Sequence, residues 1–281
     1  MEIWRRYAAV RGHALHYLKA GTGAPVVLIH GLLGGSFCWR FNVPALAERY
    51  TSLAVDLPGF GESITQRGLD CGMQAQALRL RFWLEQMGLR TVDIVASSWG
   101  AGVALLVAAS TQLVRSLVLA APVNPWSDFG MDRVRFFSGR TGATLLRLGM
   151  PFARPIHRIA LRRLYGDPAR MPSGTLEGYS RIMLCKGRAH NLIDTLRRWE
   201  QDLLAVHDAL ERVHVPSLLI WGTKDTAVDI RSAGMLMQKL RGCESVVIEG
   251  AGHLPFEETP EEFNRLVLNF LDRVSAQPEP A

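Results

Sequence analysis

The chain has 281 residues, of which 48% are apolar and 21% charged. These values exclude a fibrous or disordered protein and suit one large domain with a buried core. The four cysteines form no CxxC pair and no zinc-ligand spacing, so free thiols are expected rather than disulfides or a metal site. The longest apolar run, near 102–109, is too short to span a bilayer, and the first ten residues contain no apolar leader. We therefore expect a cytoplasmic protein.

Seven short apolar runs along the chain predict strands. Most are continuous and rich in branched residues, as strands buried on both faces of a parallel sheet are. Helical patterns lie between them, and this alternation predicts an α/β fold with helices on both faces of a mostly parallel sheet. The predicted strands are 14–19, 25–30, 52–57, 92–97, 114–120, 217–221 and 245–249, and the predicted helices are 73–87, 101–110, 233–240 and 261–274.

One stretch, from about 125 to 213, breaks the alternation. It has no buried-strand pattern, and its helical segments, such as 156–165 and 192–204, are separated by Gly and Pro. We expect a helical cap at 123–213, inserted into a core formed by 1–122 and 214–281. Its aromatic residues are candidates for the walls of a pocket: Trp126, Phe136, Phe137, Tyr165 and Tyr179.

The segment 92–102, VDIVASSWGAG, is the most informative in the sequence. A buried strand runs directly into a helix through small residues, and a serine at such a turn is strained and exposes its hydroxyl. Ser98 has the small residues Ala96 and Gly100 two positions to either side. The helix that follows places its positive dipole end behind Ser98. Two alternatives remain, that Ser98 only caps this helix and that Ser97 supplies the hydroxyl, and we favour Ser98 as a nucleophile.

The segment resembles the nucleophile elbow of the α/β-hydrolase family, GxSxG, with Ala96 in place of the first glycine. The resemblance covers about 1–122 and 214–275. It implies an eight-stranded, mostly parallel sheet with an inserted helical cap, and a catalytic triad in the chain order serine, acid, histidine.

A serine nucleophile needs a base and an acid that orients the base. His253 lies in a glycine-rich loop after a predicted strand and resembles the family's GxGH loop. Asp225 follows the strand 217–221 and resembles the family's strand-end acid. Asp229, four residues on, is the main rival for the acid, and Asp128 is a more distant one. We expect Ser98, Asp225 and His253 to form the triad.

Acyl transfer also needs hydrogen-bond donors for the developing oxyanion. The first is expected to be the backbone N–H of Trp99. The resemblance of the loop after His30 to the family's oxyanion loop points to the backbone N–H of Leu32 as the second, with Leu33 less favoured. His30 itself is expected to brace the loop, and 56–63, DLPGFGES, resembles the family's structural DxPGxGxS turn.

The residue at the nucleophile position narrows the reaction. Relatives that open epoxides or remove halides carry Asp there, whereas this chain has Ser98, so a carboxylic ester of a small to medium acyl chain is the expected substrate. Trp99 and Leu254 are expected to line the substrate pocket. Three alternatives remain: carbon–carbon hydrolysis of ring-fission products, cofactor-free haloperoxidation, and a non-catalytic receptor. No cofactor or metal is required by the expected chemistry.

The net charge of +6 is concentrated in the expected cap. Residues 131–198 contain fourteen Lys and Arg against four Asp and Glu, about +10, so the remainder carries about −4. Four arginines fall on the predicted helix 156–165 or beside it, among apolar residues. Such a helix can lie on an anionic membrane or steer anionic substrates, but a solvated face whose apolar side packs on the core is favoured. No motif indicates nucleic-acid binding. The four arginines are Arg154, Arg158, Arg162 and Arg163.

Overall fold

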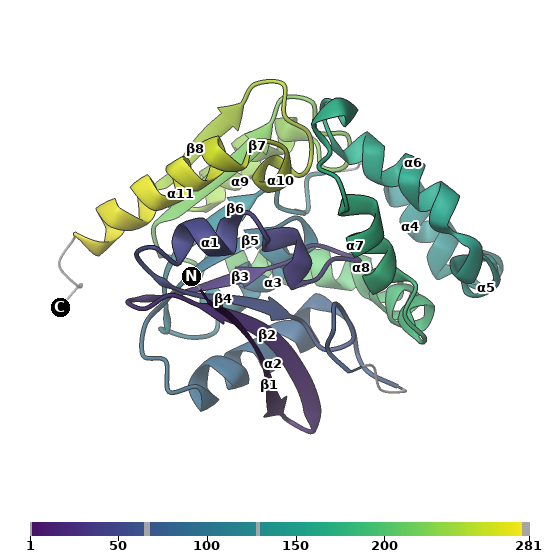
Figure 1. The fold of residues 1–281 in the computed structure, drawn as a ribbon, viewed down its shortest axis with the longest axis horizontal. Helices are drawn as coiled ribbons and strands as arrows, with labels where there is room; N and C mark the ends of the chain where they lie inside the picture. Colours follow the sequence, from purple (N-terminus) through teal and green to yellow (C-terminus); the bar gives the residue numbers. More distant parts are fainter. Residues whose placement is uncertain (1, 65–67, 128–129, 277–281) are drawn as a thin grey trace.

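The computed structural model describes residues 2–64, 68–127 and 130–276. Within them the chain forms one eight-stranded sheet in the order β1-β2-β4-β3-β5-β6-β7-β8, with helices on both faces (Figure 1). The sheet is parallel from β4 to β8, and β1 and β2 are antiparallel, so the predicted fold class is confirmed. The strands are β1 (Ile3–Val10), β2 (His13–Ala20), β3 (Pro25–Ile29), β4 (Thr51–Asp56), β5 (Val92–Ser97), β6 (Val114–Ala120), β7 (Ser217–Gly222) and β8 (Cys243–Ile248).

Strand β1 was not among the predicted strands. It lies at the edge of the sheet and most of its residues are exposed, so it lacks the apolar run that marks a buried strand. It pairs with β2 through a tight hairpin whose two turn residues, Arg11 and Gly12, both have positive φ. This is the backbone twist that favours two-residue hairpin loops.

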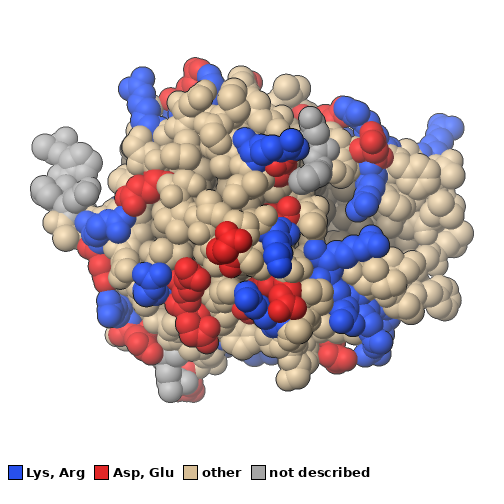
Figure 2. Space-filling model, turned by 90° about the horizontal axis from the view of Figure 1, so that it is seen from above, with Lys and Arg blue, Asp and Glu red and all other residues tan. Residues whose placement is uncertain are grey.

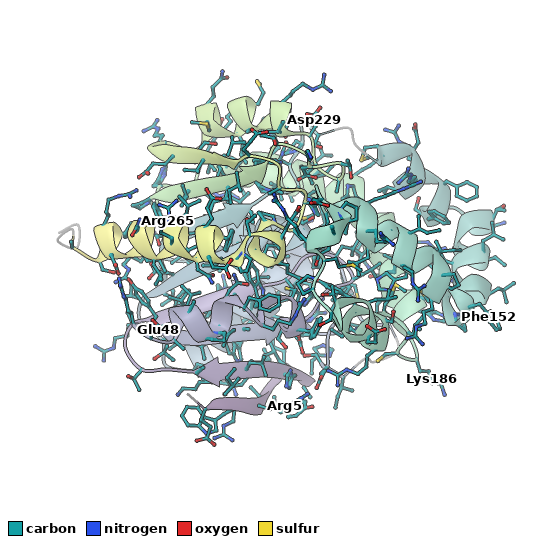
Figure 3. All side chains as sticks on the ribbon, turned by 45° about the horizontal axis from the view of Figure 1, so that its top comes forward. Arg5, Glu48, Phe152, Lys186, Asp229 and Arg265 are labelled. Atoms are coloured by element: carbon teal, nitrogen blue, oxygen red, sulfur yellow. The ribbon has the colours of Figure 1, made fainter. Side chains whose placement is uncertain are left out.

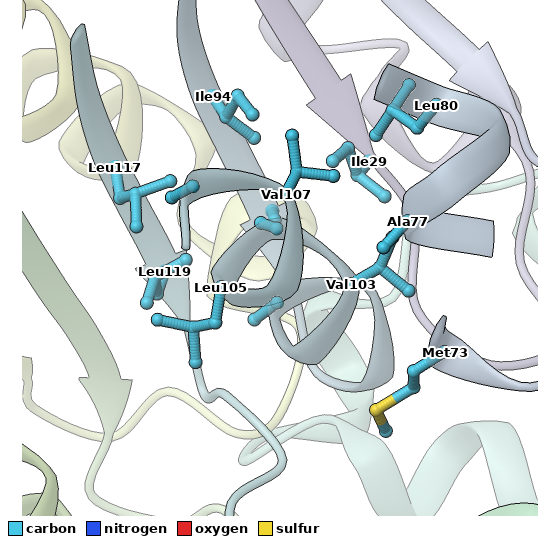
Figure 4. Close-up of a cluster of buried hydrophobic side chains, with 14 of the residues drawn as sticks. Ile29, Met73, Ala77, Leu80, Ile94, Val103, Leu105, Val107, Leu117 and Leu119 are labelled. Carbon is cyan, nitrogen blue, oxygen red and sulfur yellow. The ribbon is translucent and has the colours of Figure 1, made fainter. Parts of the chain in front are cut away.

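The central strands alternate their side chains between two apolar clusters, one on each face of the sheet. In β3, for example, Val27 and Ile29 join one cluster while Val26 and Leu28 join the other. The first cluster, part of which Figure 4 shows, is covered by α2 (Met73–Gln86), α3 (Trp99–Ala108) and α9 (Ala233–Lys239). The second is covered mainly by α1 (Asn42–Leu46), the short α10 (Pro255–Glu258) and α11 (Pro260–Ser275).

The described residues between β6 and β7 form five α-helices; the first four lie beyond one end of the sheet, and the fifth, α8, runs back to α2 and α3 (Figure 1). The described residues of this segment contain no strand. Helix α8 is longer than the predicted segment, and its C-terminal part packs in the first core cluster through Val206 and Leu210. The division at residues 122/123 and 213/214 therefore stays a prediction. The helices are α4 (Met131–Ser138), α5 (Arg140–Gly149), α6 (Arg154–Leu164), α7 (Thr175–Met183) and α8 (Arg188–Leu210).

We call residues 123–213 the cap. Polar groups buried between it and the sheet fasten it in place. The Asp202 carboxylate of α8 accepts the N–H of Met73 at 2.7 Å and so caps the first turn of α2. The buried Arg188 donates to the carbonyl oxygen of Gly61 at 2.7 Å. Burial raises the pKa of Asp202, although the N–H groups that it accepts oppose that rise.

The cap forms one end of the molecule and carries much of its positive charge. In Figure 2, Lys and Arg side chains predominate at the end where the cap helices lie. Figure 3 places Phe152 at this extreme end, whereas Glu48 and Arg265 lie over the sheet at the other side of the molecule.

Candidate active site

Ser98 lies at the sharp turn between β5 and α3. Its φ of 52° and ψ of −122° are a conformation that a side-chain-bearing residue adopts only under constraint. Three backbone hydrogen bonds impose it: its N–H donates to Ala120 at 2.9 Å, and its carbonyl accepts from Ala101 at 3.0 Å and from Val123 at 3.1 Å. Because the turn is fixed from both sides, the hydroxyl is held at the carboxyl end of the sheet.

Strained backbone gathers at this edge. Of the four described non-glycine residues with positive φ, three follow the carboxyl ends of neighbouring strands: Leu33 after β3, Ser98 after β5 and Ala121 after β6. The fourth, Arg11, belongs to the hairpin that joins the outermost strand β1 to β2, and it does not line the cavity that Ser98 lines. Strain of this kind persists where the surrounding structure over-determines it, and it clusters at functional sites.

Two glycines let the elements around Ser98 approach one another. A Cβ on Gly100 would lie 2.2 Å from the carbonyl oxygen of His30, so no larger residue fits unless the backbone moves. A Cβ on Gly31 would lie 3.2 Å from the Cβ of Ser98, which places the β3 loop directly against the serine. Ala96, in the position of the family's first glycine, is fully buried in the first core cluster.

His253 and Asp225 lie together, as the sequence predicts. The Nδ1 of His253 is 2.9 Å from Oδ2 of Asp225, and both side chains are almost completely buried. The other carboxylate oxygen accepts the N–H groups of Ala227 at 2.7 Å and Val228 at 3.0 Å, which fixes the carboxylate plane. Since the carboxylate accepts from Nδ1, the imidazole keeps Nε2 free to take a proton.

Ser98 and His253 line one cavity, but their side chains are not hydrogen-bonded to each other in the described part of the chain. Such contacts are often loose without substrate and tighten in the complex. The rival acid Asp229 is engaged elsewhere, because its carboxylate accepts from the backbone and side chain of Arg231. The other rival, Asp128, lies outside the described residues. Ser97 also lines the cavity.

His30 holds the loop that follows β3. Its Nε2 accepts the N–H of Leu57 at 3.2 Å, so the ring proton sits on Nδ1, which donates to the Gly31 carbonyl at 2.8 Å. Burial lowers the pKa of His30, which favours this neutral form. The Gly31–Leu32 peptide is trans, so the N–H of Leu32 points away from the carbonyl that His30 holds. His30 thereby sets the direction of the Leu32 N–H.

The cavity is about 960 Å³ in volume and lies between the sheet edge and the cap. Leu32, Leu33 and Leu254 line it, in agreement with the expectation for Leu254. Among the candidate aromatic residues of the cap, only Tyr179 does so. The cap also contributes Val134, Ala160, Leu161, Leu164, Trp199 and Leu203.

The expectation that the Trp99 indole lines the pocket is wrong. Its side chain is fully buried in the first core cluster, where it contacts the ring of Phe60 at 5.4 Å between centroids. The side chain of the first residue of α3 points back into the core, because the turn at Ser98 directs only the serine outward. The backbone N–H of Trp99 remains at the free N-terminus of the helix.

Sequence reasoning missed His157. It lies on α6, lines the cavity, and its Nδ1 is 3.2 Å from the hydroxyl of Ser180 on α7. Burial lowers its pKa. No spacing signal marked it, because its exposure depends on how the cap helices pack over the sheet.

Sequence reasoning also missed two buried carboxylates next to the histidine loop. Glu258 accepts the N–H of Gly252, in that loop, at 2.7 Å, and those of Gly166 at 2.9 Å and Asp167 at 2.8 Å, in the cap. The N–H of His253 donates to the carbonyl of Leu164 at 2.7 Å. The histidine loop and the cap segment 164–167 are thus fastened to each other.

Glu257, the neighbouring carboxylate, makes a second fastening. It accepts from Arg40 and Tyr165 at 2.9 and 2.8 Å, and from the hydroxyl of Tyr179. Burial beside this carboxylate raises the pKa values of both tyrosines, which keeps them protonated as donors.

The described residues contain no group of three or more His, Cys, Asp or Glu side chains arranged to hold a metal ion. None of their helices is both long enough and apolar enough to cross a bilayer.

Comparison with known proteins places this site in a family. Residues 26–266 match the model of the alpha/beta hydrolase family. The chain belongs to this family. An uncharacterized protein of Mycobacterium tuberculosis is 31% identical over 280 residues, which cover 95% of this chain and 81% of that protein. Monoacylglycerol lipase abhd6-A of Xenopus laevis is 25% identical over 92% of this chain and 78% of its own length.

Solved structures agree with the family in fold. The ligand-free epoxide hydrolase CorEH superimposes with a TM-score of 0.86, covers 97% of this chain and all of its own, and is 24% identical. At this identity the likeness concerns the fold. The protein is a hydrolase of the alpha/beta hydrolase family, in which lipases, esterases, epoxide hydrolases and dehalogenases share one architecture.

Proposed function

We propose that this alpha/beta hydrolase cleaves carboxylic esters of small to medium acyl chains through an acyl-enzyme on Ser98. The observation that carries the proposal is the pairing of His253 with Asp225 at 2.9 Å, at the wall of the cavity that Ser98 also lines. A serine on a strained turn, with a base oriented by a buried carboxylate, is the arrangement that activates a hydroxyl for acyl transfer.

The reaction begins when Nε2 of His253 takes the proton of Ser98 as Oγ attacks the ester carbonyl carbon. Asp225 stabilises the imidazolium and holds its tautomer. The tetrahedral oxyanion accepts the N–H of Trp99 and the N–H of Leu32. Collapse of this intermediate breaks the bond to the alkoxy oxygen, which takes the proton from His253 and leaves as the alcohol. Water then attacks the acyl-enzyme by the same steps and releases the acid.

Two features favour an ester over the substrates of other relatives. Epoxide hydrolases and dehalogenases of this family resemble the chain in fold but carry Asp at the nucleophile position, where this chain has Ser98. The cavity of about 960 Å³ has room for a medium acyl chain, and its lining combines aliphatic side chains such as Leu32, Leu203 and Leu254 with polar and charged ones.

The proposal is tested with p-nitrophenyl esters from acetate to decanoate. Ser98→Ala should lower kcat by at least about a thousandfold while the protein stays folded. Ser97→Ala, which removes the neighbouring hydroxyl, should lower kcat far less than Ser98→Ala does. If wild type hydrolyses no ester, carbon–carbon hydrolysis, haloperoxidation or ligand sensing replaces the proposal. If Ser98→Ala stays as active as wild type, Ser98 is not the nucleophile.

A further inference from the structure

Large apolar side chains are exposed on the outside of the cap. Of the fourteen large hydrophobic residues exposed in the described chain, six lie between residues 136 and 159, and each is 51% to 81% exposed. Isolated exposed apolar residues are ordinary, whereas a concentration in one short segment indicates an interaction surface. The six are Phe136, Leu145, Leu148, Phe152, Ile156 and Ile159.

Five of the six follow a helical stripe. They occur at 145, 148, 152, 156 and 159, with spacings of three and four residues. Such a spacing places side chains of one helix on the same side, as for Leu145 and Leu148 on α5 and for Ile156 and Ile159 on α6. Helix α5, the 3₁₀ turn Met150–Phe152 and helix α6 succeed one another with helical backbone angles at Gly149, Met150 and Ala153 between them. Figure 3 shows Phe152 at the outermost end of the molecule, directed away from it.

The charge of the same segment has one sign. Residues 136–165 contain six arginines and no Asp or Glu. Arg154 pairs with Glu177 at 3.6 Å, whereas in the described part of the chain no acidic side chain is ion-paired with Arg147, Arg158 or Arg162. These last three arginines therefore lie in the segment of the exposed apolar side chains without a carboxylate partner in the described residues.

The inner side of the same helix belongs to the active site. His157, Ala160 and Leu161 of α6 line the cavity, while Ile156 and Ile159 of that helix face outward. The favoured expectation, that the apolar side of this helix packs on the core, therefore holds only for its inner residues. One helix separates the outer surface from the cavity.

We propose that the cap outer face, defined as the six exposed apolar residues with Arg147, Arg158 and Arg162, binds the surface of an anionic lipid bilayer. Apolar side chains enter the boundary between headgroups and acyl chains, and the arginines attract anionic headgroups. If the ester hydrolase proposed above is correct, its substrates are acyl lipids taken up from that surface; this last step rests on the proposed function, and the binding does not.

Charge favours a bilayer over a second copy of the chain. A symmetric dimer formed through this face would bring the unpaired arginines of one copy against those of the other, and like charges repel. An anionic bilayer supplies both an apolar phase for the exposed residues and the opposite charge.

The test is co-flotation of the full chain with phosphatidylcholine vesicles, with and without phosphatidylglycerol. Wild type should float with the anionic vesicles, and added salt should weaken the binding. The triple variant Phe152→Ser/Ile156→Ser/Ile159→Ser should bind at least about tenfold more weakly. The triple variant Arg147→Gln/Arg158→Gln/Arg162→Gln should bind anionic vesicles about a hundredfold more weakly than wild type.

A matched control replaces three apolar residues that are 42% to 47% exposed on other elements, Leu78→Ser/Met235→Ser/Val247→Ser. It should bind as wild type does. The proposal would be overturned if wild type did not float with anionic vesicles, or if either the Ser or the Gln triple variant of the cap floated as wild type does. It would also be overturned if the control variant lost as much vesicle binding as the Ser triple variant of the cap. If wild type does not bind vesicles but forms concentration-dependent dimers, and the Ser triple variant of the cap stays monomeric, the face serves self-association instead.

The two proposals fail separately. Hydrolysis of soluble p-nitrophenyl acetate without vesicles should be the same in wild type and in the Ser triple variant of the cap. If the protein binds vesicles but hydrolyses no ester, the proposal of membrane binding holds and the proposal of ester hydrolysis is wrong.

Discussion

The edge of the sheet and the cap meet at one cavity but are built in different ways. At the sheet edge, backbone hydrogen bonds and close glycine contacts fix Ser98, His30 and the loop of His253. The cap is fastened by buried side-chain groups, with Asp202, Glu257 and Glu258 accepting across the boundary. Its outer helices expose apolar residues that no described part of the chain covers.

This difference separates two tasks. Chemistry needs groups held within a fraction of an ångström, which a strand end anchored in a packed core provides. The cap is joined to the sheet by apolar packing, as at Val206, and by polar side-chain contacts, so its cavity walls and outer surface can change without moving the strand ends. We therefore expect substitutions at the sheet edge to change kcat, and those in the cap to change stability, pocket shape or binding.

The largest expected effect tests the sheet edge. Asp225→Asn keeps the shape of the side chain, but the new amide group donates to Nδ1 of His253. The ring proton then stays on Nε2, so Nε2 cannot accept the proton of Ser98. We expect kcat for p-nitrophenyl esters to fall by about 10⁴-fold. Asp229→Asn is the matched control, since its carboxylate is held by Arg231. Equal losses in both variants would mean that the acid has been misassigned.

The sequence predicted the sheet edge well because each element there has a local signal. Continuous apolar runs mark buried strands, and small residues around Ser98 mark a turn too tight for larger ones, as the close approach of Gly100 to His30 shows. Strand β1 was not predicted because an exposed strand at the side of a sheet needs no apolar run. The direction of the Trp99 indole was mistaken because a pattern places a residue beside the nucleophile without fixing where its side chain points.

The cap was less predictable for a physical reason. Helices α4 to α7 have only 8 to 11 residues each. Whether an apolar residue such as Ile156 is buried depends on how these helices pack on one another, which the periodicity of the sequence does not show. The polar contacts between cap and sheet join residues far apart in the sequence, 92 positions for Glu258 and Gly166 and 129 for Asp202 and Met73. Glu257 and Glu258 resemble an ordinary acidic first turn of a helix, and only the fold reveals that both are buried.

An intermediate effect is expected where the two regions are fastened. Glu258→Ala removes the acceptor of three backbone N–H groups, of which that of Gly252 is buried and two are partly buried, so the free energy of unfolding should fall by about 3 kcal/mol, measured by urea denaturation. Because Gly252 next to His253 loses its partner, kcat should also fall, by about tenfold. Glu261→Ala, at an exposed position in the first turn of α11, should change stability by less than about 0.5 kcal/mol. A Glu258→Ala protein as stable as this control would show that the cap needs no such fastening.

The smallest expected effect compares a core histidine with a cap histidine. Burial lowers the pKa values of both His30 and His157 in the folded chain. The unfolded chain, in which a histidine has a pKa of about 6.5, therefore binds more protons than the folded chain near and below that pH. The free energy of unfolding falls as the pH is lowered through about 6.5. His157→Gln should make this decline in the free energy of unfolding shallower, as measured by urea denaturation at each pH. His30, the more deeply buried of the two, should account for most of the slope that remains in His157→Gln. A slope identical to that of wild type would mean that His157 is as hydrated as an exposed histidine, and that the cap stands further from the sheet edge than its contacts with the cavity indicate.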